Sequence, residues 1–266
     1  MGLEALVFDV DGTLADTEEA HREAFNAAFL EHGLDWYWSR SRYSELLGVS
    51  GGRERMLLHL ESLPQSQAAK AALGERIPEI HRSKVRAFKG LAETGQIPLR
   101  PGVRRLIKEA RDAGLKLGIA TTGTAAGVEA LITRNLGDGA VGWFRVFAAG
   151  HQVPNKKPAP EIYRLVLQSL KTLPSEAVAF EDSENGVRAA RAAGLFVIAT
   201  PSFWTLAQDF SQSDLLLPTL GDPDQPIPEP IARLRIRGAP FVDLAVVKRL
   251  HAASVRGSEA VAPGAG

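Results

Sequence analysis

The chain has 266 residues, 45% of them hydrophobic and 23% charged, which suffices for a substantial core in one elaborated domain or in a domain with a smaller companion. Basic and acidic residues balance at 31 each, so nothing indicates a nucleic acid or a membrane surface as a partner. The absence of cysteine excludes a disulfide framework, a thiolate metal site and a cysteine nucleophile.

No run of apolar residues approaches the length of a membrane span, and the N-terminus lacks the basic and apolar regions of a signal peptide. We therefore expect a cytoplasmic protein, with a plastid location left open if a transit peptide has been removed. No exposed apolar stripe is obvious in the sequence, so a monomer is expected.

The first predicted element is a buried strand at residues 3–8, which is short, apolar and rich in β-forming residues. The region from about 17 to 98 then shows almost purely helical periodicity. Helices are expected from about residue 17 onward and at 40–47, 53–63, 67–73 and 77–93.

From residue 101 onward, strands and helices alternate. The expected helices are 101–114, 125–135, 160–170 and 185–193. The expected strands are 116–123, 145–149, 177–180, 196–199 and 214–217. Alternation of this kind predicts an α/β fold, a Rossmann-like parallel sheet covered by helices on both faces.

The helical region interrupts this alternation after the first strand. We interpret residues 17–98 as an inserted second domain, and residues 1–16 together with 99–220 as the core domain. Residues 221–266 form a C-terminal extension, which is proline-rich at 221–240 and has an amphipathic pattern at 241–253 that is expected to pack on the core. From about residue 257 the chain is expected to be disordered.

Polar residues follow the predicted strands where each strand ends. Ligands of an open parallel sheet bind beyond the carboxyl ends of its strands, so these residues are expected to converge. They are Asp9 and Asp11, then Thr121 and Thr122, then the loop with Lys156 and Lys157, and finally Glu181 and Asp182. Each group alone has an ordinary explanation as a turn, a helix cap or a solvated pair, but their joint occurrence in order predicts one site.

These motifs resemble those of a known family. DVDGT, a hydroxyl residue at the end of the second strand, the lysine in KKPAPEIY, and EDSENG together resemble the haloacid-dehalogenase superfamily of phosphotransferases. The inserted helices resemble the cap domain of that superfamily. The stretches ELLGVSGGRERM and LRPGV further resemble the CbbY-type sugar-bisphosphate phosphatases, which are related to β-phosphoglucomutase.

A divalent cation would resolve the repulsion between Asp9 and Asp11, which extended backbone directs to the same side. Hard oxygen ligands favour Mg²⁺ as the cofactor. The resemblance implies that the Asp9 carboxylate, the Asp11 backbone carbonyl and Asp182 bind the metal, with Glu181 nearby in support.

The resemblance also implies catalytic roles. Asp9 would attack phosphorus and form an aspartyl phosphate, and Asp11 would act as acid and base, a role suited to a carboxyl group with a raised pKa. Thr121 and Lys157 would hold phosphoryl oxygens. Of the two neighbouring lysines, Lys157 is preferred because it directly precedes the proline of the motif.

The cap is expected to bind the rest of the substrate, and residues 50–53 are a plausible cradle for a second phosphate. A solvated helix face, a core histidine or a turn between helices remains an equally good explanation for any one of the candidates. The candidate substrate-binding residues are Glu18, His21, Arg22, Tyr43, Gly51, Gly52, Arg53, Arg55, Lys84 and Thr122.

The expected function is a Mg²⁺-dependent phosphatase of small phosphorylated sugars, with xylulose 1,5-bisphosphate as the best substrate. The alternatives are a sugar phosphate mutase similar to β-phosphoglucomutase and a broad sugar monophosphate phosphatase. A carbon–halogen hydrolase would have no use for Asp11 or for the acidic pair at 181–182. A catalytically inactive scaffold is disfavoured because both aspartates of the first motif are intact.

Overall fold

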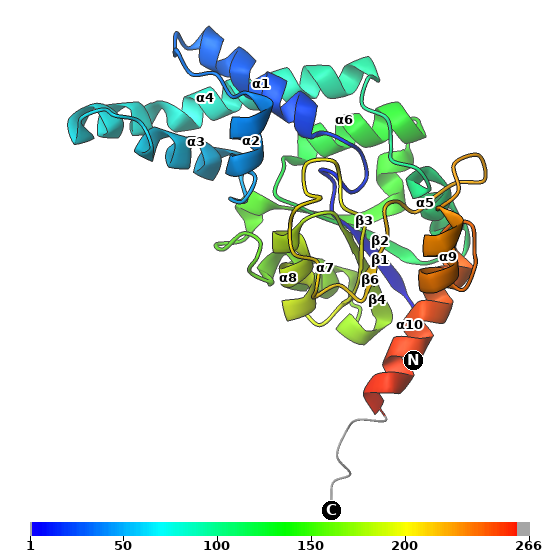
Figure 1. Ribbon diagram of the computed structural model, residues 1–266. Coiled ribbons are helices and arrows are strands. Elements are labelled where there is room, and N and C mark those ends of the chain that lie inside the picture. The colour runs from blue at the N-terminus through cyan, green and yellow to red at the C-terminus, as the bar shows by residue number, and fades with distance from the viewer. Residues whose placement is uncertain (1, 260–266) are drawn as a thin grey trace, which may run out of the picture.

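The structure is a computed structural model that describes residues 2–259. Its centre is a six-stranded parallel sheet in the order β3-β2-β1-β4-β5-β6 (Figure 1). The strands are β1 (Ala5–Phe8), β2 (Lys116–Thr121), β3 (Phe144–Ala149), β4 (Ala177–Glu181), β5 (Phe196–Ala199) and β6 (Leu215–Leu216). The predicted parallel α/β fold is therefore confirmed.

The register of the sheet aligns the strand ends that carry the predicted site motifs. Phe8 of β1 lies opposite Ile119 of β2 and Phe180 of β4. Because these strands are parallel, the residues that follow them lie at one edge of the sheet. The convergence predicted from the sequence thus has a direct basis in strand pairing.

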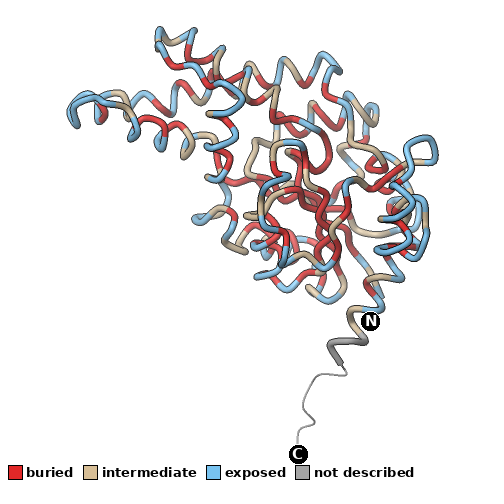
Figure 2. The backbone as a smooth tube through the Cα atoms, viewed as in Figure 1, coloured by how far each residue is buried: buried red, intermediate tan, exposed pale blue. Residues whose placement is uncertain are grey.

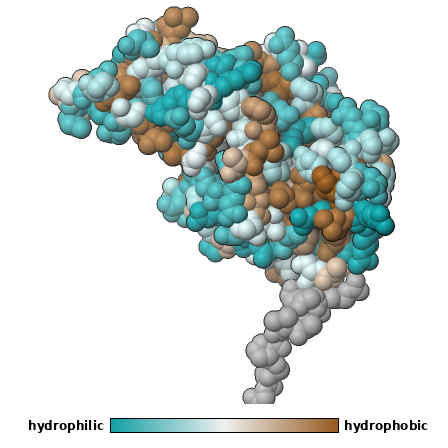
Figure 3. Space-filling view, in the orientation of Figure 1, coloured by the Kyte–Doolittle hydropathy of each residue, from teal (hydrophilic) through white to brown (hydrophobic). Residues whose placement is uncertain are grey.

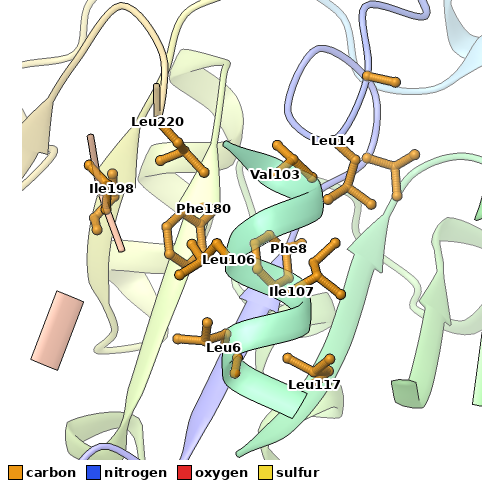
Figure 4. Packing of buried hydrophobic residues seen from close by; sticks show 14 of the residues in the cluster. Leu6, Phe8, Leu14, Val103, Leu106, Ile107, Leu117, Phe180, Ile198 and Leu220 are labelled. Carbon is orange, nitrogen blue, oxygen red and sulfur yellow. The ribbon is translucent and has the colours of Figure 1, made fainter. Parts of the chain in front are cut away.

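Alternate residues of β1 face opposite layers of helices, as the period of an extended strand requires. Leu6 and Phe8 belong to a hydrophobic cluster with α5 (Val103–Asp112), α6 (Ala125–Leu136), α9 (Glu229–Ile236) and α10 (Leu244–Glu259), part of which Figure 4 shows. Ala5 and Val7 pack on the other face against α7 (Glu161–Leu170) and α8 (Glu184–Ala192). Phe8 and Phe180 stack at 4.7 Å between ring centroids, directly beneath the strand ends.

Four helices lie beside the carboxyl ends of the strands in Figure 1, and we propose that they form the cap domain. They are α1 (Glu18–Glu31), α2 (Arg40–Leu46), α3 (Gly52–Glu61) and α4 (Gln67–Thr94). A separate aromatic-rich cluster with Phe25, Phe29, Trp38 and Tyr43 holds them together. Figure 2 shows their buried and exposed residues in alternation, while the strands of the sheet are buried almost throughout.

The α-helices differ from the predicted ones by more than two residues in three places. The stretches predicted as separate helices at 67–73 and 77–93 form one helix, α4, with Pro78 inside it. Burial of Ile77 and Ile80 against the cap cluster offsets the single backbone donor that proline lacks.

Helix α9 was missed because prolines dominate residues 221–240. It begins with Glu229 and Pro230, and the first turn of a helix tolerates proline because the missing N–H has no partner there in any case. Helix α10 is described as far as Glu259. The disorder expected from about residue 257 stays a prediction, and the stretch 260–266 lies outside the described residues.

Among the described helices, none has both the length and the apolar composition that a membrane crossing needs. On the face shown in Figure 3, hydrophobic residues occur in separate groups among hydrophilic ones. Some large apolar side chains are exposed, including Phe203, Leu206 and Leu234. The expectation of a monomer stays a prediction.

Candidate active site

The turn after β1 brings the first motif to the edge of the sheet. The Asp9 amide continues the ladder by donating to the Phe180 carbonyl at 3.0 Å, and the chain then turns at Gly12, which has a φ of 80°. A Cβ atom on Gly12 would lie only 2.0 Å from Asp182 Oδ2. Glycine is therefore required both by the left-handed conformation and by the close approach of the acidic loop.

A buried ion pair lies at the centre of the site. Lys157 Nζ donates to Asp9 Oδ1 and Glu181 Oε1, both at 2.6 Å, and to the Ala120 carbonyl at 2.9 Å. Tyr163 donates its hydroxyl to the same Glu181 oxygen at 2.5 Å. With all three donors of the ammonium group used, Lys157 is fixed between the ends of β1, β2 and β4.

The pKa of Asp9 is raised well above its ordinary value. Burial is the main cause, and the charges of Glu181, Asp182 and Asp11 add to it against the attraction of Lys157. The pKa of Lys157 is also raised, because the attraction of Asp9 and Glu181 outweighs the effect of burial. One ammonium group thus faces an excess of carboxylates.

That excess fits a divalent cation. Oxygen atoms of Asp9, Glu181 and Asp182, all buried, lie within 4.8 Å of one another. Burial and the charge of Glu181 raise the pKa of Asp182, whose Oδ2 accepts a hydrogen bond from Thr205 Oγ1 at 3.2 Å. Buried carboxylates are costly unless paired or bound to a metal, and an all-oxygen donor set suits Mg²⁺.

Asp11 belongs to a second network that reaches into the cap. Its Oδ1 accepts hydrogen bonds from Thr17 Oγ1 at 2.7 Å and from His21 Nε2 at 2.8 Å. Lys84 Nζ lies 2.7 Å from His21 Nδ1, and the His21 ring stacks on Phe88 at 3.8 Å. Asp11 is therefore linked through the His21 ring to the ammonium group of Lys84 on α4.

A raised pKa was expected for Asp11 from its acid–base role, and the structure indicates the opposite. Burial raises the pKa of Asp11, but the His21 and Thr17 hydrogen bonds and the charges of His21 and Lys84 outweigh it. The lowered pKa favours the carboxylate, the form that acts as a base. Burial lowers the pKa of Lys84 itself to about 8.

The predicted substrate-binding residues separate into two groups. A cavity beside Asp11 is lined by His21, Gly51, Gly52, Arg55, Lys84 and Thr122. An adjoining cavity is lined by Asp9, Asp11, Glu18, Thr122, Lys157 and Asp182. Thr122 and Asp11 line both, so the two cavities meet at the strand ends.

The other predicted residues do not line these cavities. Arg22 donates to Glu19 and to the Trp38 carbonyl, and Arg53 is exposed. Tyr43 is buried and donates to Glu18 at 2.6 Å.

Thr121 also lies behind the cavity walls. Its side chain is buried, and Oγ1 accepts a hydrogen bond from the Gly123 amide at 2.9 Å. Its assignment to a phosphoryl oxygen stays a proposal.

His81 was missed by the sequence analysis although it lines the cavity. Burial and the charges of Lys84, Arg53 and Lys156 lower its pKa to about 4. Its position three residues before Lys84 on α4 places both side chains on one helical face, a spacing that could have identified it.

Comparison with known proteins decides the family. The model of the haloacid dehalogenase-like hydrolase family matches residues 3–194. The chain belongs to this family. The predicted superfamily and the predicted phosphatase class of enzyme are thereby confirmed.

Individual members of the family extend the comparison. Protein CbbY of Rhodobacter capsulatus is 47% identical over 230 residues, 86% of this chain and 99% of the relative. The crystal structure of a CbbY variant from Rhodobacter sphaeroides in complex with xylulose-(1,5)bisphosphate matches with 45% identity and a TM-score of 0.75, over 82% of this chain and 94% of that one. β-Phosphoglucomutase of Clostridium difficile shares the fold, with a TM-score of 0.66 at 19% identity over 96% and 99% of the two chains.

Proposed function

We propose that this enzyme removes phosphate from small phosphorylated sugars in a Mg²⁺-dependent reaction, with xylulose 1,5-bisphosphate as its best substrate. The observation that carries the proposal is the buried Asp9 carboxylate, held by Lys157 beside the acidic pair Glu181 and Asp182. The substrate is favoured because the similar CbbY structure was solved with xylulose-(1,5)bisphosphate.

In the first step, Asp9 attacks phosphorus. Lys157 binds Oδ1, so we assign the attack to Oδ2. A bond forms between this oxygen and phosphorus, and the bond between phosphorus and the sugar oxygen breaks. The leaving sugar oxygen receives its proton through Asp11, whose carboxylate takes that proton from the phosphate monoanion of the bound substrate and ends the step unprotonated. Lys157 offsets the charge on Asp9 as the phosphoryl group approaches.

In the second step, Asp11 accepts a proton from water as that water attacks phosphorus. The bond between phosphorus and Asp9 breaks, and inorganic phosphate leaves. The lowered pKa of Asp11, set by His21, Thr17 and Lys84 against burial, suits this step.

The acidic residues would hold the metal. The Asp9 and Asp182 carboxylates would bind Mg²⁺ with the Asp11 carbonyl, and Glu181 would support them through Lys157. When bound, the metal supplies positive charge that stabilises the phosphoryl oxygens.

Recognition of the sugar and of a second phosphate is assigned to the cap. Arg55 and Lys84 contribute cations to the cavity, and Gly51 and Gly52 bring the backbone close to it. His81, with its pKa lowered to about 4, is neutral near pH 7 and can donate one hydrogen bond there.

A screen of phosphate release tests this function. Purified enzyme is offered sugar monophosphates and bisphosphates with and without Mg²⁺, and we expect strong preference for a pentulose bisphosphate and no release in chelator. Conversion of a hexose 1-phosphate into its isomer without phosphate release would instead identify a mutase. Turnover that is unchanged by chelation would contradict the metal assignment.

Binding of Mg²⁺ should also increase the free energy of unfolding and the Tm of the protein. At 100 times its Kd, Mg²⁺ stabilises the folded state by about 2.7 kcal/mol, which corresponds to a rise of roughly 5–10 °C in Tm. The raised pKa of Asp182 means that the metal-free folded state binds protons more tightly than the unfolded state, so its stability falls as pH rises. Mg²⁺ competes with these protons.

The rise in Tm caused by Mg²⁺ should therefore be larger at pH 8 than at pH 5, as measured by scanning calorimetry. Asp182→Asn serves as the matched variant, and it should lose most of the shift. An equal shift in wild type and variant would show that the metal binds elsewhere.

A further inference from the structure

The segment 48–54 of the cap contacts two parts of the core, the loop with Lys156 and the first turn of α8. Glu54 of α3 forms an ion pair with Lys156 of the core, with 2.5 Å between Oε1 and Nζ. Asn185 of α8 donates from Nδ2 to the Gly48 carbonyl at 3.0 Å and to Ser50 Oγ at 3.4 Å. The cap has a hydrophobic cluster of its own, but α1 and α4 also pack on the core through Ala24, Phe88 and Ala92. The polar contacts of segment 48–54 therefore form a second link between cap and core, beside the acidic residues of the active site.

The two core residues adjoin the catalytic groups. Lys156 directly precedes Lys157, whose ammonium group holds Asp9, and Asn185 follows the acidic pair at 181–182 by three residues. Any displacement of the cap segment relative to these residues changes the cavity beside Asp11, because Gly51 and Gly52 form part of its wall.

Gly51 lies against the ion pair between Glu54 and Lys156, where there is no room for a side chain. A Cβ atom at this position would lie 2.2 Å from Glu54 Oε2 and 2.6 Å from Lys156 Nζ. Its φ of 102° also disfavours any other residue. The glycine that the sequence suggested as a phosphate cradle therefore has a second role, since its lack of a side chain makes room for the pair between cap and core.

We propose that Glu54 and Lys156 are positioning residues that fix the cap segment 48–54 over the active site, and thereby set the affinity for substrates that reach the cap. Glu54 Oε1 and Lys156 Nζ are partly shielded, with 40% and 24% of the side chains exposed. The pair would hold the cap closed while the sugar phosphate is bound. This inference rests on the proposed function, because its main measurement is sugar phosphate turnover.

A charge-reversal cycle tests the proposal. Neutralising the pair with Glu54→Gln should raise KM for the preferred sugar phosphate by about 2–5-fold, the range of a partly exposed ion pair. Lys156→Glu and Glu54→Lys, which place like charges together, should each raise KM by about tenfold with a smaller change in kcat. The double variant, with both charges exchanged, should recover most of the lost affinity.

The matched control is Lys89→Glu, which makes the same charge change in an exposed pair within α4, Lys89 with Glu93 at 3.5 Å. Its KM should stay within twofold of wild type. A second substrate, p-nitrophenyl phosphate, lacks a second phosphate for the cap, so its KM should respond much less to Lys156→Glu than that of the sugar phosphate.

Hydrogen exchange gives a readout that does not depend on turnover. Amides of residues 48–54 should exchange faster in Lys156→Glu than in wild type and return towards the wild-type rate in the double variant. A double variant as weak as the single ones, or exchange that is the same in all variants, would overturn the proposal. Absence of turnover in wild type, with the expected exchange pattern, would instead overturn the proposed function alone.

Discussion

Replacing Asp9 with asparagine should lower phosphate release by at least about 10⁴-fold, because removal of a covalent nucleophile leaves only binding and electrostatic assistance. The amide keeps an oxygen that can accept the Lys157 hydrogen bond, so little volume or bonding is lost. Burial and three neighbouring carboxylates raise the pKa of Asp9, and removing its charge relieves that repulsion. Steady-state kinetics and thermal melting measure the two effects.

The matched control is Asp11→Asn, which removes a carboxylate two residues away but not the nucleophile. Its turnover should fall by only about 10²–10⁴-fold, the usual contribution of acid–base catalysis. The Asp9 variant should melt no lower than wild type in the absence of Mg²⁺. Turnover above a hundredth of wild type in Asp9→Asn would exclude an aspartyl phosphate on this residue.

The sheet could be predicted from the sequence because its signals are local. Apolar strands such as 177–180, followed by helices with glycine stops, specify a parallel sheet, and strand pairing then brings the ends together. This is why the carboxylates and Lys157 were found. The extent of α4 and the presence of α9 were predicted incorrectly, because each helix contains a proline. Pro78 is tolerated inside α4 by the burial of its neighbours, and Pro230 is tolerated because it lies in the first turn of α9.

The substrate-binding residues of the cap could be predicted less well, because the sequence does not show which face of each cap helix points towards the active site. His21 and Arg22 are adjacent, yet about 100° of helical rotation turns one towards Asp11 and the other towards Glu19. Arg53 and Arg55 differ in the same manner, since only Arg55 lines the cavity. Which face points inward depends on tertiary packing of the aromatic cluster around Trp38, which no local pattern reports.

The pKa of Asp11 could not be predicted from the sequence for the same reason. A raised pKa was expected for Asp11 because that would suit a role in acid–base catalysis. The groups that lower it, His21 and Lys84, are 10 and 73 residues away in the chain and meet it only through the packing of α1 on α4. Charge balance in a site depends on contacts that are distant in sequence.

Replacing Lys157 with methionine should cause the largest combined loss of stability and activity. Methionine fills similar space, but it leaves Asp9 and Glu181 buried without the ammonium group that lies 2.6 Å from each. Breaking a buried ion pair in this way costs about 3–5 kcal/mol, a fall of roughly 6–20 °C in Tm. Turnover should fall by about 10²–10³-fold, because the charge that offsets Asp9 during attack is lost.

The pH dependence identifies the cause of that loss. The attraction of Lys157 opposes the burial that raises the pKa of Asp9, so the pKa of Asp9 rises further in the variant. A carboxyl whose pKa is raised in the folded state loses stability as pH rises, and the deficit relative to wild type should shrink from pH 8 to pH 5. Lys156→Met is the control, because its ion pair is partly exposed and its removal should cost no more than about 1 kcal/mol. If Lys157→Met and Lys156→Met had the same Tm, the buried ion pairs of Lys157 would contribute no more to stability than the partly exposed pair of Lys156.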